Sequence, residues 1–161
     1  MDREPQLPLR AGPRPRTTCE LPHSQLDQQP EDSRHVDDIL AEASSWPSVL
    51  AGPSAIAGEG ARALMLDAGA AARPREAFIV GQEFCHAHAH GDFSLHAALP
   101  FPLAAAAERS GWAEPHPLAS SGAAPATIVM LYAPRDHAEQ EVVRALVRAS
   151  YEYALSQLAA V

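Results

Sequence analysis

The sequence predicts an α+β fold, in which helices pack on one face of a mostly antiparallel sheet to give two layers, preceded by an extended N-terminal arm. Short apolar runs typical of strands alternate with stretches of helical periodicity. Two neighbouring runs flank a Gly-Asp turn signal, which predicts a β-hairpin. With 161 residues, of which 47% are hydrophobic and 20% charged, the chain is long enough to bury such a core.

The N-terminal segment, residues 1–30, is predicted to be the arm, and residues 31–161 to be a single α+β domain. Leu9–Arg16 cannot form a helix or a central strand, because its prolines lack the backbone N–H. Two arrangements stay open: the arm lies across the domain, or it is loose. In the first arrangement its contacts are Leu21, His23 and Leu26.

The first predicted helix follows Pro30 and stops at Pro47. Glu31 and Asp32 suit its N-terminus, where the helix dipole favours negative charge. Residues at helical spacing give it one apolar face: Val36, Ile39, Leu40, Ala43 and Trp46. We then expect irregular chain at Ser48–Gly60, a strand at Arg62–Asp67 and a loop at Gly69–Arg75.

The second half is predicted to carry two hairpin strands, a short helix, a loop, a buried strand and a last helix. The hairpin strands are Ala77–Cys85 and Phe93–Leu99. The short helix is Pro102–Ser110, closed by Gly111, and the loop is Trp112–Pro125. The buried strand is Thr127–Tyr132, and the last helix runs to about Leu158. Asp136 and Glu139 form a capping pattern at the start of the last helix. Its apolar stripe is Val142, Leu146, Ala149 and Tyr153, broadened by Val143 and Val147.

Charge and composition exclude several classes of function. A net charge of -8 argues against binding to nucleic acid or to an anionic membrane surface. All 12 basic residues are arginine, so Schiff-base catalysis by lysine is excluded. Cys19 and Cys85 are expected to be free thiols, and the N-terminus has no apolar signal region, so we expect a cytoplasmic protein. Apolar runs such as Ala126–Ala133 are too short to span a membrane.

Four of the eight histidines fall within eleven residues, and this cluster is the main functional signal. His86, His88 and His90 alternate along a predicted strand and would share one face. The turn decides whether His96 joins them. A two-residue turn at Gly91-Asp92 places His88 opposite Leu95 and turns His96 away, whereas a three-residue turn through Phe93 places His88 opposite His96.

Two kinds of chemistry fit converging imidazoles. His86, His88 and His96 are suitable nitrogen ligands for a transition metal, with Glu83 or Asp92 as a carboxylate. The same rings can act as general bases and acids without a metal. A purely structural role for the histidines is the third interpretation.

Further motifs extend this pattern along the chain. They are Pro13-Arg-Pro-Arg-Thr-Thr, Pro22-His23-Ser-Gln-Leu-Asp27-Gln, Glu83-Phe-x-His86-x-His88, Ser94-Leu-His96-x-x-Leu-Pro100, Gly111-Trp-x-Glu114-Pro-His116-Pro-Leu and Tyr132-x-Pro-Arg135-Asp136. In this order, from about Pro13 to Leu155, they resemble the small bacterial proteins of the luciferase-domain family. That family takes its name from similarity to fungal luciferase, which oxidises a hydroxylated pyrone with molecular oxygen.

The resemblance implies an oxygen-dependent oxidase or oxygenase acting on a small molecule. It implies catalytic roles for His86, His88, His96 and His116, and leaves out His90, where relatives commonly carry proline. Glu83, Trp112 and Tyr132 are expected to bind the substrate, although Trp112 is equally explained as a core residue. The resemblance requires no cofactor, and a transition metal on the first three histidines is the alternative. A binding module without turnover is the second functional interpretation, and the sequence leaves the oligomeric state open.

Overall fold

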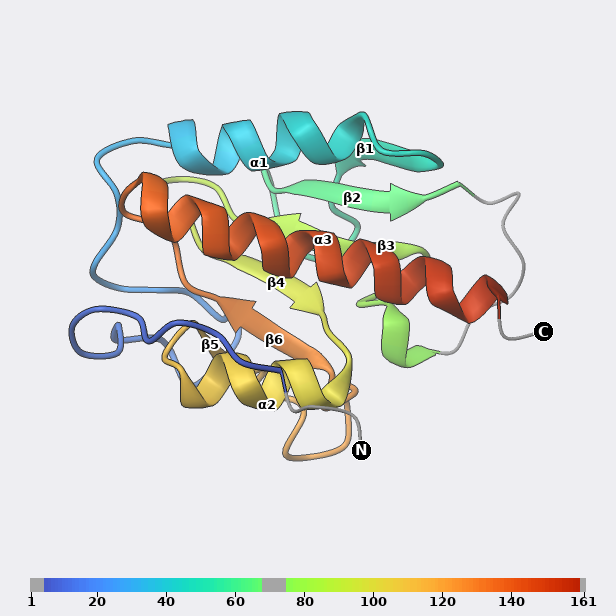
Figure 1. The fold of residues 1–161 in the computed structure, drawn as a ribbon. Helices are drawn as coiled ribbons and strands as arrows, with labels where there is room; N and C mark the ends of the chain where they lie inside the picture. The colour runs from blue at the N-terminus through green and yellow to red at the C-terminus, as the bar shows by residue number, and fades with distance from the viewer. Residues whose placement is uncertain (1–4, 68–74, 160–161) are drawn as a thin grey trace.

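A sheet of antiparallel strands organises the fold (Figure 1). The computed structural model describes residues 5–67 and 75–159, and within these ranges six strands lie in the order β1-β2-β3-β4-β6-β5. The elements are α1 (Arg34–Ser44), β1 (Val49–Pro53), β2 (Arg62–Leu66), the 3-10 helix η1 (Arg75–Ala77), β3 (Glu83–Ala87), β4 (Leu95–Ala98), α2 (Phe101–Arg109), β5 (Ala113–Pro115), β6 (Ile128–Leu131) and α3 (His137–Ala159).

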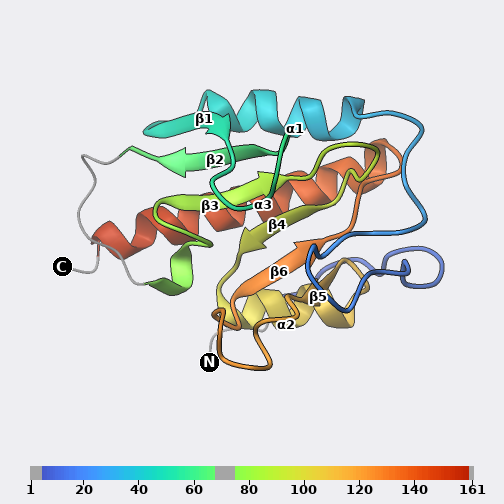
Figure 2. The same cartoon turned by 180° about the vertical axis from the view of Figure 1, so that it is seen from behind.

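The helices lie on one face of this sheet, and the N-terminal arm runs past the end of α2 and then crosses the opposite face (Figures 1 and 2). α3 runs along β3 and β4, α1 packs beside α3, and α2 lies near β5 at one edge. The prediction of an α+β fold with helices on one face and an extended arm is confirmed. Because the helices occupy one face, polar side chains of the central strands have room only on the other.

Side chains alternate between the two faces of the central strands. One face packs in the core beneath the helices, and the opposite face, which carries His86 and His96, is called the site face below. Cys85 and Ala87 on β3, and Leu95 and Ala97 on β4, are completely buried in the hydrophobic core beneath the helices. His86 and His96, the intervening residues, pair across the two strands on the opposite face. Small alanines on the core face bring α3 close to the sheet, where it buries Val143, Leu146, Val147 and Tyr151.

The helices were predicted well, with shifts at their ends. α1 ends at Ser44, before Trp46, yet that indole stays buried and packs against Tyr151 at a centroid distance of 5.1 Å. The capping pattern of α3 is confirmed, since the Glu139 N–H donates to Asp136 Oδ1 at 2.9 Å. Its apolar stripe is centred on Val143 and Val147, so Val142, Ala149 and Tyr153 are only partly buried.

Three strand predictions need correction. Part of the expected irregular chain at Ser48–Gly60 is the edge strand β1, which tolerates Gly52 and Pro53 because an edge leaves some backbone groups unpaired. Part of the expected loop at Trp112–Pro125 is the other edge strand, β5. The strand predicted at Ala77–Cys85 begins only at Glu83, after η1 and a turn at Gly81, whose φ is 55°. The expected loop at Gly69–Arg75 lies almost wholly outside the described residues.

Both predicted turn lengths of the β3–β4 hairpin are wrong. His86 pairs with His96, and the His88 N–H donates to the Ser94 carbonyl at 3.0 Å, so the connection is the longer segment 89–93. Asp92 stabilises it by accepting hydrogen bonds from the Ser94 N–H and hydroxyl. This register still places His86, His88 and His96 on one face, as only the longer of the two predicted turns did.

The arm lies across the site face, as one of the two open arrangements predicted. His23 is buried there, whereas Leu21 and Leu26 are 58% and 53% exposed, so polar side chains rather than these leucines fasten the arm. The buried Gln25 accepts a hydrogen bond from the Ala133 N–H at 2.8 Å and donates to the Asp27 carbonyl.

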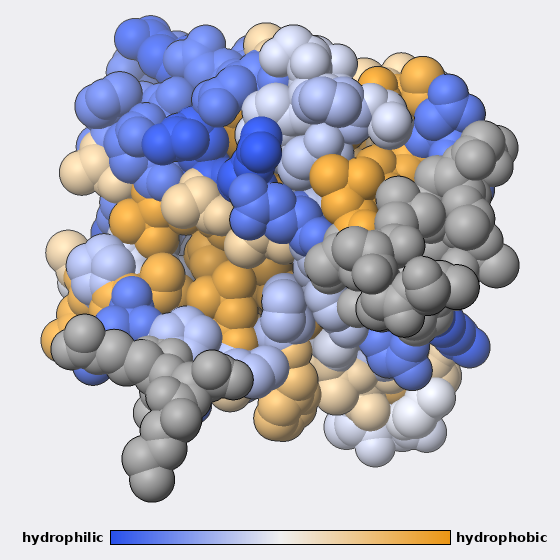
Figure 3. Space-filling view, turned by 45° about the vertical axis from the view of Figure 1, so that its right-hand side comes forward, coloured by the Kyte–Doolittle hydropathy of each residue, from blue (hydrophilic) through white to orange (hydrophobic). Residues whose placement is uncertain are grey.

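The remaining surface findings concern the thiols and the distribution of polarity. Cys19 is exposed and Cys85 is buried, and both are free thiols. Among the described residues, no helix combines the length and hydropathy that a membrane crossing needs. In the view of Figure 3, hydrophilic residues gather at the upper left and apolar residues form separate patches toward the centre.

Replacing Gln25 tests how the arm is held. Gln25→Ala leaves the buried Ala133 N–H without its acceptor, which should lower the free energy of unfolding by about 1–3 kcal/mol. Urea denaturation measures the change, with Gln6→Ala, an exposed glutamine of the same arm, as the matched control. Equal stability of the two variants would show that this bond does not hold the arm.

Candidate functional site

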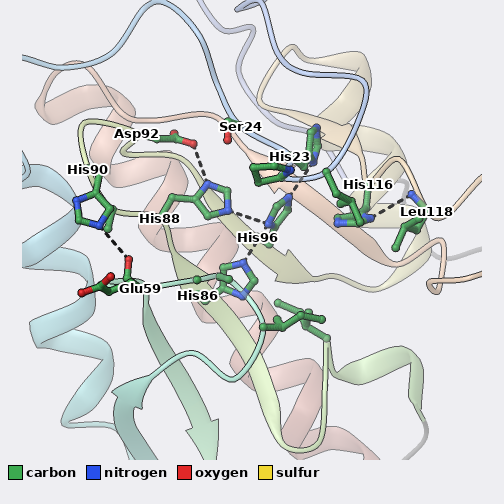
Figure 4. Close-up of a pocket in the computed structure, with 17 residues that line it drawn as sticks. His23, Ser24, Glu59, His86, His88, His90, Asp92, His96, His116 and Leu118 are labelled. Atoms are coloured by element: carbon green, nitrogen blue, oxygen red, sulfur yellow. Dashed lines mark hydrogen bonds and ion pairs between the residues drawn. The ribbon is translucent and has the colours of Figure 1, made fainter.

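A pocket of about 510 Å³ opens on the site face, between the arm, the β3–β4 hairpin and two loops (Figure 4). Six histidines line it, together with apolar side chains and two carboxylates. The lining residues are Leu21, Pro22, His23, Ser24, Ile56, Ala57, Gly58, Glu59, Ile79, His86, His88, Ala89, His90, Asp92, His96, His116 and Leu118. The pocket is therefore apolar around its walls and rich in imidazole where those six rings reach it.

A β-bulge brings Glu83 and His86 to the same face. Leu64 of β2 pairs with Cys85, but the next residue, Met65, pairs with Glu83, so Phe84 is an extra residue in β3. In a regular strand, residues three apart point to opposite faces, and the bulge removes that difference. His86 Nδ1 consequently donates to Glu83 Oε1 at 2.6 Å, and Ser54 Oγ donates to the same oxygen at 2.8 Å.

The hairpin loop provides a second carboxylate–imidazole pair. His88 Nδ1 lies 3.0 Å from Asp92 Oδ2 and 2.9 Å from Ser94 Oγ. Ser94 Oγ donates to the other oxygen of Asp92, so the proton on His88 Nδ1 is directed at oxygen acceptors. The other ring nitrogen, Nε2, is thereby left as the basic atom of His88.

His96 lies at the centre of the cluster, with a neighbour on each ring nitrogen. Its Nδ1 is 3.0 Å from His86 Nε2 and 3.1 Å from His88 Nε2. Its Nε2 is 2.9 Å from Nδ1 of His23, which the arm provides. Figure 4 shows these rings converging from the hairpin strands and the arm on one point.

The arm histidine connects the cluster to a third carboxylate. His23 Nε2 donates to Glu114 Oε1 at 2.6 Å, and the Tyr132 hydroxyl donates to the other oxygen of Glu114 at 3.0 Å. His23, Glu114 and Tyr132 come from the arm, β5 and the end of β6. Three separate segments thus complete the polar network behind His96.

His116 lies beside the network but is turned differently. Its ring is 5.0 Å from that of His96 and 5.5 Å from that of His23, measured between centroids. Its Nδ1 accepts a hydrogen bond from the Leu118 N–H at 3.2 Å, so the proton of the neutral ring is on Nε2.

The three carboxylates are held in their charged form. Burial alone would raise the pKa of Glu83, Asp92 and Glu114, but hydrogen bonds from the neighbouring imidazoles and hydroxyls outweigh it and keep each pKa below its usual value. Burial, followed by the charge of Glu114, raises the pKa of Tyr132 to about 12, so its hydroxyl stays a donor.

Burial favours the neutral form of three rings, His86, His96 and His116. Burial lowers the pKa of His86 despite the opposing effect of Glu83. Burial lowers the pKa of His96 much further, helped by the surrounding histidines, and burial also lowers that of His116. Neutral rings keep a lone pair for binding a proton or a metal ion.

The expected site residues do not all reach the pocket. His86, His88, His96 and His116 line it, while Glu83 and Tyr132 reach it only through the histidine network. Trp112 belongs to the hydrophobic core, where its Nε1 donates to the Pro8 carbonyl at 2.6 Å. His90 lies at the rim with a φ of 59°, bonded to the Glu59 carbonyl and apart from the central rings.

His23 and Glu114 were not among the predicted site residues. His23 stands 73 positions before His96, and no periodicity connects an irregular arm with a strand. The sequence signal for both residues is their place in the motifs Pro22-His23 and Glu114-Pro-His116.

Two sets of histidines are close enough to hold a metal ion. Within each set, one nitrogen of every ring lies within 4.8 Å of the others: His86, His88 and His96 in the first, and His23, His96 and His116 in the second. Because His96 belongs to both sets, the sets share a ligand.

The comparisons with known proteins agree with the resemblance. Residues 81–150 match the family model of the luciferase domain. The segment contains the whole β3–β4 hairpin, with His86, His88 and His96, and also His116. These findings support a luciferase-domain family. The relatives reported are fungal, so the bacterial grouping stays a prediction.

Curated relatives extend the similarity beyond that segment. The chain is 29% identical to the luciferases of Armillaria ostoyae and Armillaria gallica over 165 aligned residues, which cover 92% of this chain. It spans 61% of the length of those relatives. A luciferase of Neonothopanus nambi is 38% identical over 74 residues, or 45% of this chain and 28% of that protein. No solved structure gives a significant match.

The carboxylate pairs predict which tautomers the histidines adopt. Because Glu83 and Asp92 accept from Nδ1, His86 and His88 should both carry their proton on Nδ1. Long-range nitrogen–proton NMR spectra of the imidazoles at neutral pH measure this, with the exposed His137 as an internal reference. Protons found on Nε2 of both rings would contradict the network.

Removing Glu83 should destabilise the fold. Glu83→Ala leaves His86 Nδ1 and the Ser54 hydroxyl without their buried acceptor, which should cost about 2–4 kcal/mol of the free energy of unfolding. Glu20→Ala removes an exposed carboxylate and is the control in chemical denaturation. A loss no greater than in the control would mean that the bulge does not depend on this carboxylate.

Proposed function

We propose that this protein is a luciferase-domain enzyme that binds a small organic molecule in the histidine-lined pocket and promotes its oxidation by molecular oxygen. The observation that carries the proposal is a pair of carboxylate–imidazole units, Glu83–His86 and Asp92–His88, which line one pocket and whose Nε2 atoms converge on His96 Nδ1. The relatives named luciferase support the reaction class.

This arrangement suits removal of a proton from an acidic hydroxyl. An imidazole with a carboxylate behind Nδ1 is oriented as a base, and the carboxylate stabilises the charge that the ring acquires. An enol or phenol that loses its proton becomes an electron-rich anion, from which oxygen takes electrons. Of the two bases, His88 is the more accessible, because its side chain is 11% exposed against 3% for His86.

The lining of the pocket favours an uncharged ligand. Its walls come from residues such as Leu21, Ile56, Ile79 and Leu118, and none of the lining residues is lysine or arginine. In the metal-free pocket, a phosphate or carboxylate group would meet Glu59 and Asp92 without a compensating cationic side chain. We therefore expect a neutral molecule with an apolar body, whose hydroxyl faces the histidines.

Oxygen consumption tests the proposal. The chain is mixed with neutral enols, phenols and hydroxylated pyrones, and oxygen uptake above the rate without protein is expected for at least one class. In His88→Asn the rate should fall at least about 100-fold, as expected when a general base is lost. In His137→Asn, which changes an exposed histidine of α3 outside the pocket, the rate should stay within about twofold of the unmodified chain.

The alternative function is a binding module without turnover. It predicts that a compound of these classes binds, as measured by calorimetry, and that His88→Asn weakens binding while no oxygen is consumed. If no compound of the three classes binds or leads to oxygen uptake, both functions are rejected.

A further inference from the structure

We propose that the cluster is a mononuclear site for a divalent transition-metal ion, bound by His86 Nε2, His88 Nε2 and His96 Nδ1. This proposal rests on the ring nitrogens alone and does not depend on the oxidation proposed above. With the ion bound, the Nε2 atoms of His86 and His88 are ligands and not bases, so the base role proposed above belongs to the metal-free site. The proposal also assigns a role to each of the three carboxylates, Glu83, Asp92 and Glu114, and to the arm.

Hydrogen bonds fix which nitrogen of each ring is basic. Glu83 and Asp92 accept from Nδ1 of His86 and His88, so both Nε2 atoms carry lone pairs. His23 Nε2 donates to Glu114, so His23 Nδ1 also carries a lone pair and accepts from His96 Nε2. That leaves the His96 Nδ1 lone pair facing the two Nε2 lone pairs across 3.0 and 3.1 Å.

No neutral tautomer satisfies this arrangement. A neutral His96 carries one proton, while its two nitrogens face three basic atoms of His23, His86 and His88. Moving the proton to Nδ1 leaves His96 Nε2 facing the His23 Nδ1 lone pair instead. Buried lone pairs directed at one another are unfavourable, and a cation among three of them removes the repulsion.

The distances and charges suit such a cation. Nitrogens bound tetrahedrally at about 2.0–2.1 Å from an ion lie about 3.3–3.4 Å apart, so the observed 3.0 and 3.1 Å need only a small outward movement of the rings. Glu83 and Asp92 bond the ligand rings directly, and Glu114 bonds His96 through His23. Carboxylates behind histidine ligands are typical of metal sites, and their three negative charges favour a doubly charged ion.

The second histidine set is the weaker candidate. His116 Nδ1 accepts from the Leu118 N–H, so its Nε2 is a donor and binds metal only if that bond breaks. In addition, a neutral His96 has only one lone pair, and both sets need it. An ion bound to the first set therefore prevents a second ion from binding to the other set. The first set therefore holds the ion, and the pocket beside it leaves further coordination positions open to water or a ligand.

The donor set indicates the class of metal. Imidazole nitrogens suit zinc, cobalt, nickel, copper and iron, whereas magnesium and calcium prefer oxygen ligands. Zinc and cobalt ions are the probes chosen, because zinc binding gives heat in calorimetry and cobalt reports its coordination in visible absorption. The chain must carry no added histidine tag.

The unmodified chain, stripped of metal, is titrated with each ion. We expect one equivalent of zinc to bind, magnesium to be ineffective, and one equivalent of cobalt to give the visible bands of nitrogen coordination. Absence of zinc and cobalt binding, or two equivalents of tightly bound zinc, would overturn the proposal. Neither measurement involves oxygen or an organic substrate, so failure here is distinct from failure of the proposed oxidation.

Paired variants then identify the ligands. His88→Asn should weaken zinc binding by more than the roughly 10–100-fold cost of losing a second-shell partner, and His23→Asn should weaken it within that range. His116→Asn should change it less than tenfold, and His137→Asn on the surface of α3 should leave it unchanged. A loss in His116→Asn as large as in His88→Asn, or no loss in His88→Asn, would overturn the assignment.

Thermal unfolding checks that each variant is folded. If His88→Asn does not fold, Asp92→Asn tests the same ligand, because it keeps the size of the side chain but weakens the acceptor of the His88 proton. A 10–100-fold loss of zinc affinity is expected. Unchanged affinity in the folded Asp92→Asn variant would reject His88 as a ligand.

Discussion

The burial of the His96 ring is the constraint on which the rest of the site depends. Its two nitrogens are enclosed between strands and arm, and a buried polar atom without a partner costs about 1–3 kcal/mol. Imidazoles lie on both sides of the ring, each of them directed by its own carboxylate: His23 accepts from His96 Nε2, while Nδ1 faces the lone pairs of His86 and His88, where the proposed ion would bind. The network therefore fixes tautomers and ring orientations before any ligand or ion arrives, which is how preorganised sites gain affinity.

The carboxylates reach their histidines by different routes. Glu83 depends on a bulge in β3, and Asp92 on the five-residue hairpin connection, so both pairs are local in sequence. Glu114 is remote from His23, and their bond forms only because the arm crosses the sheet to β5. The arm is consequently part of the site, and whatever loosens it removes both the buried His23 and the link from Glu114 to His96.

The sequence predicted the strand faces and helices that follow from the spacing of residues. It missed the contacts that depend on irregular backbone. Alternation placed His86 and His88 on one face, and helical spacing located α1 and α3. The extra residue at Phe84, which turns Glu83 toward His86, has no signature in a strand of apolar residues. The hairpin register depends on Asp92 bonding Ser94, and simple turn rules did not include those bonds. His23 was missed as a site residue because its contact with His96 joins segments 73 residues apart.

The two faces of the sheet are linked at the bulge itself. Ser150 of α3 is completely buried, and its hydroxyl donates to the Phe84 carbonyl at 3.0 Å. A bulged residue leaves backbone groups outside the regular ladder, and this bond from the helix layer gives one of them a partner. Packing of α3 thereby stabilises the backbone distortion that directs Glu83 to His86 on the opposite face. The hydrophobic core does more than support the site: it selects the local strand geometry on which the first carboxylate–imidazole pair depends.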